Sequence, residues 1–295
     1  MRRVIGPISV AACAIGLLSG ITAFPVNAGT APNRADKNLG IFLDKPSIHN
    51  LLWDDDWNGH NTIKKGDIHT FSKKVASSSW IDGASGYGVT SLSFRETVNA
   101  SKICGTTRAP SSISTVDVIT WATCMAGMPG TKVHVPIPRI PISNDLYVVY
   151  LPERTTIKDD LTIKAFTLGT TTYGPFTFVK NSSCDDYGAY HALSAYIGGL
   201  FPIAIIPAKC AKGNIDSLTE AASHEIIEAI TDPIPLAGWI DNSYTNDPPD
   251  FKRFKAGEVA DICSSAGAVP TAPVKKRGGY SLVPYWSNSK GKCTT

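Results

Sequence analysis

The segment 224–228, with the sequence HEIIE, contains the residues best suited to chemistry. On a helix, His224 and Glu228 would lie one above the other on a single face, because they are four positions apart. In H-E-x-x-H metallohydrolases two helical histidines bind zinc, and the glutamate between them takes a proton from the attacking water. Glu228 replaces the second histidine here, and a carboxylate oxygen is also an acceptable zinc ligand. We therefore expect one divalent metal, zinc first and Mn²⁺ or Ca²⁺ as alternatives, with Glu225 as the general base.

A further metal ligand must come from elsewhere in the chain, and the segment 257–263 offers two acids. Glu258 and Asp261 are three positions apart and would share one face of a short helix that begins at Gly257. We expect Glu258 to complete the metal shell and Asp261 to orient one of the ligands. The alternative for all these residues is a polar helix face in water, because a short motif is a weak signal by itself.

His191 is a second candidate catalytic residue, although it lies far from the motif in sequence. Its imidazole could bind the metal or donate a hydrogen bond to a substrate oxyanion. Alternatively, it is a hydrogen-bonded core histidine beside Tyr187 and Tyr190. The sequence leaves both roles open.

The motif lies within a pattern that is typical of an amphipathic helix. Residues 217–220, with the sequence SLTE, have the form of a capping box at the start of this helix. The apolar stripe that follows consists of Leu218, Ala222, Ile226, Ala229 and Ile230. Pro233 predicts the end of the helix, because its ring disfavours helical geometry in the residue before it.

The remaining elements predict a single α+β domain with a mixed, twisted sheet over residues 46–295. We expect strands at 48–53, 87–94, 146–151, 171–179 and 201–206, and further helices at 63–77 and 112–125. The run 146–151 is the strongest strand signal, because it is continuously apolar and is bounded by Asp145 and Pro152.

The amino terminus predicts export. Arg2 and Arg3 precede a long apolar run, and the small residue Ala28 ends a segment typical of a signal peptide over 1–28. An uncleaved membrane anchor is the alternative, because the run is nearly long enough to span a bilayer. Once the signal is cleaved, we expect no stable membrane insertion. Residues 29–45 are polar and are expected to form a leader without a core of its own.

Six cysteines remain when the expected signal peptide is removed. They are Cys104, Cys124, Cys184, Cys210, Cys263 and Cys293. An even number in an exported chain predicts up to three disulfides, and six cysteines allow fifteen pairings. We expect nearest-neighbour pairing, which would close three loops of modest length. No CxxC pair occurs, which argues against a thiolate zinc site.

The composition excludes several other classes of protein. The net charge is +3, from 28 Lys and Arg against 25 Asp and Glu, and the loss of Arg2 and Arg3 leaves 26 against 25. Such a balance argues against a nucleic-acid partner. Hydrophobic residues make up 43% of the chain, which is enough to form a core rather than a disordered polymer. No G-x-S-x-G elbow is present, which argues against a serine hydrolase.

Several segments resemble the phosphate-induced/EXORDIUM-like secreted proteins and their bacterial and fungal relatives. The strongest are SHEIIEAITDP at 223–233, GWID at 238–241 and GEVADIC at 257–263, and the similarity touches most of 47–295. The resemblance implies an extracellular or wall-associated protein with a zincin-like core, but it gives no substrate. Plant members of that family are tied to growth and signalling rather than to a settled reaction.

Three functions compete. The first is a secreted or periplasmic zincin-type peptidase acting on peptides or proteins, with His224, Glu228 and Glu258 as ligands and Glu225 as the base. The second is a binding or signalling protein on a degenerate zincin scaffold, with cell-wall association. The third is a glycan-binding module that uses exposed aromatic residues such as Trp239, Tyr244 and Trp286.

Overall fold

The computed structural model describes most of the chain from Ala35 onward. The described residues are 35–37, 41–54, 57, 59–100, 102–127, 142–163, 166–168, 171–173, 176–185, 187–196, 199–235, 238–241, 257–264 and 274–295. The expected signal peptide 1–28, much of the expected leader 29–45 and Tyr244 lie outside these residues.

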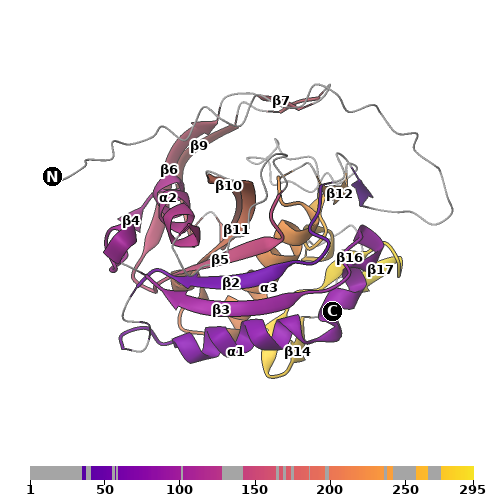
Figure 1. Ribbon diagram of the computed structural model, residues 1–295, viewed down its shortest axis with the longest axis horizontal. Coiled ribbons are helices and arrows are strands. Elements are labelled where there is room, and N and C mark those ends of the chain that lie inside the picture. Colours follow the sequence, from indigo (N-terminus) through magenta and orange to yellow (C-terminus); the bar gives the residue numbers. More distant parts are fainter. Residues whose placement is uncertain are drawn as a thin grey trace.

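A five-stranded twisted sheet forms the centre of the molecule (Figure 1). Its strands, in spatial order, are β10 (Tyr190–Tyr196), β11 (Gly199–Pro207), β5 (Asp145–Leu151), β2 (Ser47–Leu52) and β3 (Ser93–Asn99). The last four run parallel, and β10 pairs antiparallel with β11 at one edge. The expected mixed, twisted sheet with accompanying helices is therefore confirmed.

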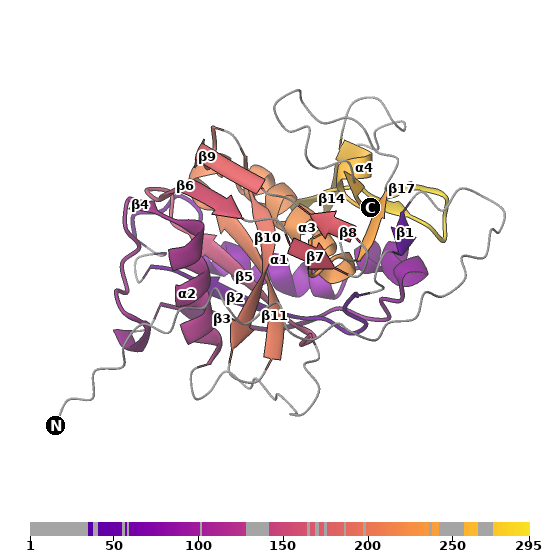
Figure 2. The same ribbon diagram turned by 90° about the horizontal axis from the view of Figure 1, so that it is seen from above.

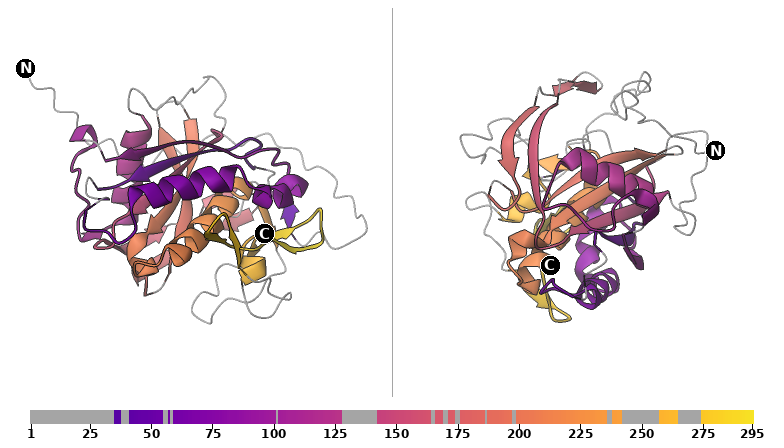
Figure 3. Two further views of the ribbon diagram at one scale, coloured as in Figure 1. Left: turned by 90° about the horizontal axis from the view of Figure 1, so that it is seen from below. Right: turned by 90° about the vertical axis from the view of Figure 1, so that its left-hand side faces the viewer.

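Helices cover both faces of this sheet. They are α1 (Lys65–Ala76), α2 (Thr115–Ala126) and α3 (Ile215–Thr231). The helices α1 and α3 lie on one face, α1 against β2 and β3 and α3 against β5, β10 and β11 (Figure 3, left). Helix α2 packs on the opposite face (Figure 2). The sheet is thus the middle of three layers.

The position of β5 between two cores explains why its sequence is apolar without interruption. Val148 and Tyr150 point into the core under α1 and α3, whereas Val149 and Leu151 point into the core under α2. Side chains alternate between the two faces of a strand, so a strand covered on both sides needs apolar residues at every position.

Smaller sheets surround this core. A three-stranded sheet joins β1 (Asp36–Lys37), β12 (Trp239–Asp241) and β13 (Gly257–Glu258), and α4 (Asp261–Ser264) follows directly. The carboxyl-terminal hairpins are β14 (Lys275–Arg277) with β15 (Tyr280–Leu282) and β16 (Tyr285–Ser287) with β17 (Lys292–Thr294). A second three-stranded sheet has β6 (Thr156–Ile163) between β4 (Ser112–Ile113) and β9 (Phe176–Ser182). Strand β7 (Phe166–Leu168) pairs with β8 (Thr171–Tyr173).

Two strand predictions were wrong. The segment expected as strand 87–94 instead ends the 3₁₀ helix Ser79–Tyr87, and β3 begins only at Ser93. Gly88 adopts a φ of +95°, which closes that helix, and the buried Tyr87 hydroxyl donates to the carbonyl of Trp286. The expected strand 171–179 is divided between β8 and β9. Two further short 3₁₀ helices span Lys102–Cys104 and Ala208–Ala211.

The cysteine pairing follows the nearest-neighbour prediction. Disulfides join Cys104 to Cys124, Cys184 to Cys210 and Cys263 to Cys293. Such bonds persist in a non-reducing compartment. Within the described residues, no helix combines the length and the apolar character needed to cross a bilayer.

Candidate metal centre

Helix α3 carries the HEIIE segment, and Asn214 caps its amino terminus. The Asn214 side-chain oxygen accepts hydrogen bonds from the backbone N–H groups of Asp216 and Ser217, at 2.9 and 3.4 Å. The predicted capping box at 217–220 is therefore wrong, because a better capping residue lies three positions earlier. The predicted end is confirmed, since α3 stops at Thr231, two residues before Pro233.

The first group of ligand atoms lies where α3 meets α4. Nε2 of His224 is 3.0 Å from Oε1 of Glu228 and 3.2 Å from Oδ1 of Asp261. The backbone N–H of Asp261 also donates to Oε1 of Glu228, at 3.3 Å. This contact holds the start of α4 against α3. One imidazole nitrogen and two carboxylate oxygens thus converge in the first group, which is a donor set that suits a divalent metal.

The second group is centred on His191 of β10. His191 is directly opposite Ala204 of β11, which packs in the core beneath α3, so its imidazole points toward that helix. Nδ1 of His191 is 3.4 Å from Oε2 of Glu225, 3.6 Å from Oε2 of Glu258 and 3.9 Å from Oε2 of Glu228. The side chain is buried. His191 is therefore part of the candidate site, and it is also hydrogen-bonded in the core.

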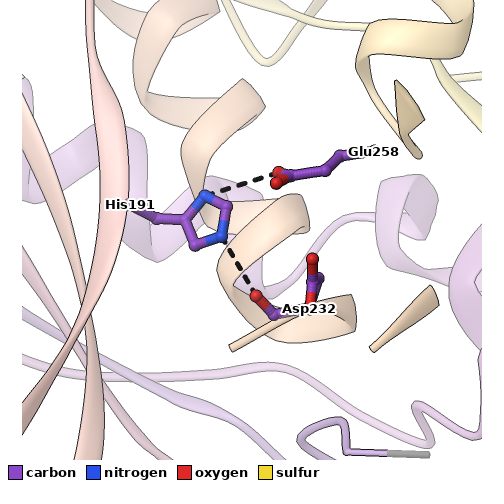
Figure 4. Close-up of side chains that lie close together, drawn as sticks. All are labelled: His191, Asp232 and Glu258. Carbon is purple, nitrogen blue, oxygen red and sulfur yellow. Dashed lines mark hydrogen bonds and ion pairs between the residues drawn. The ribbon is translucent and has the colours of Figure 1, made fainter. Parts of the chain in front are cut away.

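Asp232 completes this second group, and sequence analysis assigned it no role. Nε2 of His191 lies 3.0 Å from the backbone carbonyl oxygen of Asp232 (Figure 4). The Asp232 carboxylate lies near Glu258, and its Oδ1 accepts from the backbone N–H of Gly238 at 2.6 Å. The sequence does contain a signal for Asp232. It directly precedes the proline that stops α3, so its acidic side chain is fixed immediately after the helix.

The two acids of segment 257–263 do not share a helix face, contrary to prediction. Glu258 belongs to β13, whereas Asp261 begins α4. The turn between them sends Glu258 toward His191 and Asp261 toward His224. The geometry therefore favours Asp261, rather than the expected Glu258, as the third ligand beside His224 and Glu228.

Burial and mutual repulsion shift the titration of this cluster. Burial raises the pKa of Glu228 to about 7; the His224 charge opposes this shift and the Asp261 charge adds to it. Burial, reinforced by Glu228 and Asp232, also holds the pKa of Glu258 well above the usual range of a glutamate. In both glutamates, burial and the neighbouring carboxylates disfavour the ionised form of the side chain.

The two imidazoles respond in the opposite sense. Burial alone would lower the pKa of His191, but the adjacent carboxylate of Glu225 outweighs it and the pKa is raised. Burial is likewise outweighed at His224, where Glu228 and Asp261 hold the pKa well above that of a free histidine. Each imidazole therefore lies in a strongly negative environment, which attracts cations.

A cavity of about 490 Å³ opens beside this cluster. His224 and Glu225 line one side of it, together with Glu220 and Ala221 from the preceding turn of α3. The opposite wall includes residues just before β10, at the end of β11 and in the 3₁₀ helix that follows β11. A small molecule or side chain in this cavity would lie next to His224 and Glu225.

Comparisons of the chain with protein-family models, with curated proteins and with solved structures each returned no match. The geometry of the site is therefore the basis for a function.

Proposed function

We propose that this protein is a metal-dependent hydrolase of zincin type, with peptides as its substrates. The observation that carries the proposal is the convergence of His224 Nε2, Glu228 Oε1 and Asp261 Oδ1 at the edge of a cavity that Glu225 also lines. Two of these ligands come from one helix at the spacing that metallohydrolases use. Three protein ligands leave a position open for water or substrate, as in catalytic zinc sites.

A zinc ion held by these three residues would supply a Lewis acid that polarises a carbonyl group and makes water more acidic. Glu225 would accept the proton of the attacking water and pass it to the departing amine. Its carboxylate is buried beside His191, so it has few competing contacts with solvent.

The edge of the sheet supports a peptide as the substrate. Among the described strands of the central sheet, β10 pairs only with β11, and the residues just before β10 line the cavity. An extended peptide can add to the free edge of a sheet through backbone hydrogen bonds, while a neighbouring pocket selects one side chain. The cavity walls include Ile206, Leu218 and Val283, so we propose that this side chain is apolar.

We further propose that the protein acts outside the cytoplasm, as its signal-like amino terminus and its resemblance to EXORDIUM-like proteins suggest. The three disulfides support this location. Association with a cell wall is part of the same proposal.

The decisive experiment compares Glu225→Gln with the wild-type protein. The amide has the same shape as the carboxylate but cannot act as a base. We expect the variant to keep its fold and its zinc at the His224 group, and to lose about 10²–10⁴-fold in kcat on a peptide library. Circular dichroism, metal analysis and mass spectrometry of the products measure these three properties.

Glu220→Gln is the matched control, because Glu220 lies one turn earlier on the same helix and lines the same cavity. It should change KM at most and leave kcat close to that of the wild type. Hydrolysis that survives Glu225→Gln contradicts the mechanism. A zinc-loaded protein that cleaves no peptide, ester or glycan supports the competing binding or signalling function instead.

A further inference from the structure

We infer that the site holds two divalent cations, bridged by the Glu228 carboxylate, rather than one. This inference extends the proposed metal centre and rests on it. The first cation would bind at His224, Glu228 and Asp261, as proposed above. The second would bind at His191, Glu258 and Asp232, with the other oxygen of Glu228 as the shared ligand.

The two oxygens of Glu228 face different groups. Its Oε1 is 3.0 Å from His224, whereas its Oε2 is 3.9 Å from Nδ1 of His191. A buried carboxylate whose oxygens face two separate imidazoles is placed as a bridging ligand would be. Paired metal ions of this kind occur in several classes of hydrolase, where they act together on the attacking and departing groups.

The hydrogen bonding of His191 points to a ligand at Nδ1. Its Nε2 lies 3.0 Å from the carbonyl oxygen of Asp232 (Figure 4), and a carbonyl oxygen can only accept. Nε2 must therefore carry a proton, so the neutral imidazole has its lone pair on Nδ1. Metal-binding histidines almost always donate their other N–H to a carbonyl or a carboxylate in this way.

The distances around Nδ1 fit a shared cation better than an ion pair. A hydrogen bond between a charged histidine and a carboxylate measures about 2.7–2.9 Å. The proposed ligand oxygens of Glu258 and Glu228 are instead 3.6 and 3.9 Å from Nδ1, and the nearest carboxylate oxygen, on Glu225, is 3.4 Å away. Two ligand atoms that each lie about 2.0–2.1 Å from one tetrahedral zinc are separated by about 3.4 Å.

The number of buried carboxylates in the cluster also supports more than one cation. Two imidazoles are grouped with five carboxylates, which belong to Glu225, Glu228, Asp232, Glu258 and Asp261. All except that of Asp261 are largely buried. Buried carboxylates need a paired charge or a metal. A cation at the His224 group would contact Glu228 and Asp261, whereas a second cation at His191 would also contact the buried Glu258 and Asp232.

Zinc stoichiometry tests the inference directly. The full-length mature protein is stripped with a chelator, reloaded with Zn²⁺ alone, desalted and analysed for zinc and protein. We expect two zinc ions per wild-type chain, one in His191→Ala and one in His224→Ala. Glu228→Gln should lose both ions or bind both at least tenfold more weakly. His69→Ala is the matched control and should retain two, because His69 is an exposed histidine on α1.

The number of zinc ions bound per wild-type chain tests the second site even if a variant fails to fold. A single zinc per wild-type chain that His224→Ala removes and His191→Ala retains overturns the second site and leaves the hydrolase proposal intact. A second ion that His191→Ala retains also overturns this assignment. Two ions without any hydrolysis contradict the proposed function but confirm the two-metal centre.

Discussion

At the scale of single residues, the two acids of segment 257–263 have separate partners. Asp261 contacts His224, whereas Glu258 contacts His191. The sequence indicated both acids and their proximity to the motif, and it favoured Glu258 as the ligand beside His224, whereas Asp261 is the acid that lies closest to His224. The assignment depends on the turn between β13 and α4, which a three-residue spacing cannot distinguish from a turn of helix.

The first prediction concerns these two acids. In a His191→Ala background, which leaves only the His224 group, Asp261→Asn should weaken zinc binding by at least tenfold, because a neutral amide is a poor ligand. Glu258→Gln should change the affinity by less than threefold. Competition with a chromophoric chelator measures both constants. A larger loss from Glu258→Gln would restore the assignment made from sequence.

The second prediction concerns pH and a residue remote from the site. Burial alone would raise the pKa of Asp145, but hydrogen bonds from His49 and Ser143 outweigh it and lower the pKa. His49 Nε2 is 2.9 Å from Asp145 Oδ1. Because the folded pKa lies below the unfolded one, this stabilisation is present above about pH 4 and is lost as the pH falls through the folded pKa.

Asp145→Asn should therefore reduce the free energy of unfolding by about 1.5–3 kcal/mol at pH 7. The difference from wild type should shrink steadily below pH 4. Urea unfolding at several pH values measures it, with Asp44→Asn as the control at a neighbouring exposed carboxylate. A difference that stays constant down to pH 2 would contradict the assignment.

At the scale of elements, the sequence predicts best where one strong local signal agrees with tertiary packing. The apolar run of β5 and the helical spacing of α1 and α2 are such cases, and each element was found within a few residues of its prediction. The 3₁₀ helix Ser79–Tyr87 is the contrary case. Its Trp80 and Tyr87 side chains pack and hydrogen-bond against the carboxyl-terminal hairpins, about two hundred residues away.

The third prediction concerns the cap of α3. Asn214→Ala should destabilise the protein by about 1 kcal/mol, because two backbone N–H groups at the start of the helix lose their acceptor. Ser217→Ala, at the position that sequence analysis favoured, should cost less than about 0.5 kcal/mol. Chemical denaturation of both variants measures the difference. Equal losses would show that the two residues share the role.

At the scale of the whole molecule, the site joins parts of the chain that are far apart in sequence. His191 comes from the edge strand, Glu225 and Glu228 from α3, and Glu258 from a small outer sheet. Sequence analysis could identify the helix, because its motif is local. It could not place His191, because the side-chain direction depends on the register of β10 against β11.

The fourth prediction concerns the Cys263–Cys293 disulfide, which anchors the segment that carries Asp261 to the last hairpin. Replacement of both cysteines by serine should cost about 3–4 kcal/mol and should also weaken zinc binding at the His224 group. The same change at Cys104 and Cys124 should cost about 3 kcal/mol but leave zinc affinity unchanged, because that disulfide packs with α2 on the opposite face of the sheet.

Calorimetry and zinc titration of the two double variants separate stability from metal binding. Equal zinc affinity in both double variants would show that the site does not depend on this anchor.

The attachment of segment 257–264 to residues 286 and 293 bears on the order in which parts of the protein can assemble. Val259 accepts a hydrogen bond from the backbone of Trp286, and Cys263 requires Cys293, so these two contacts form only after residues 286 and 293 have left the ribosome. The motif helix and the central sheet can assemble earlier, because all their residues precede position 232. The nascent chain would therefore lack the disulfide that secures this side of the candidate site until Cys293 has been synthesised.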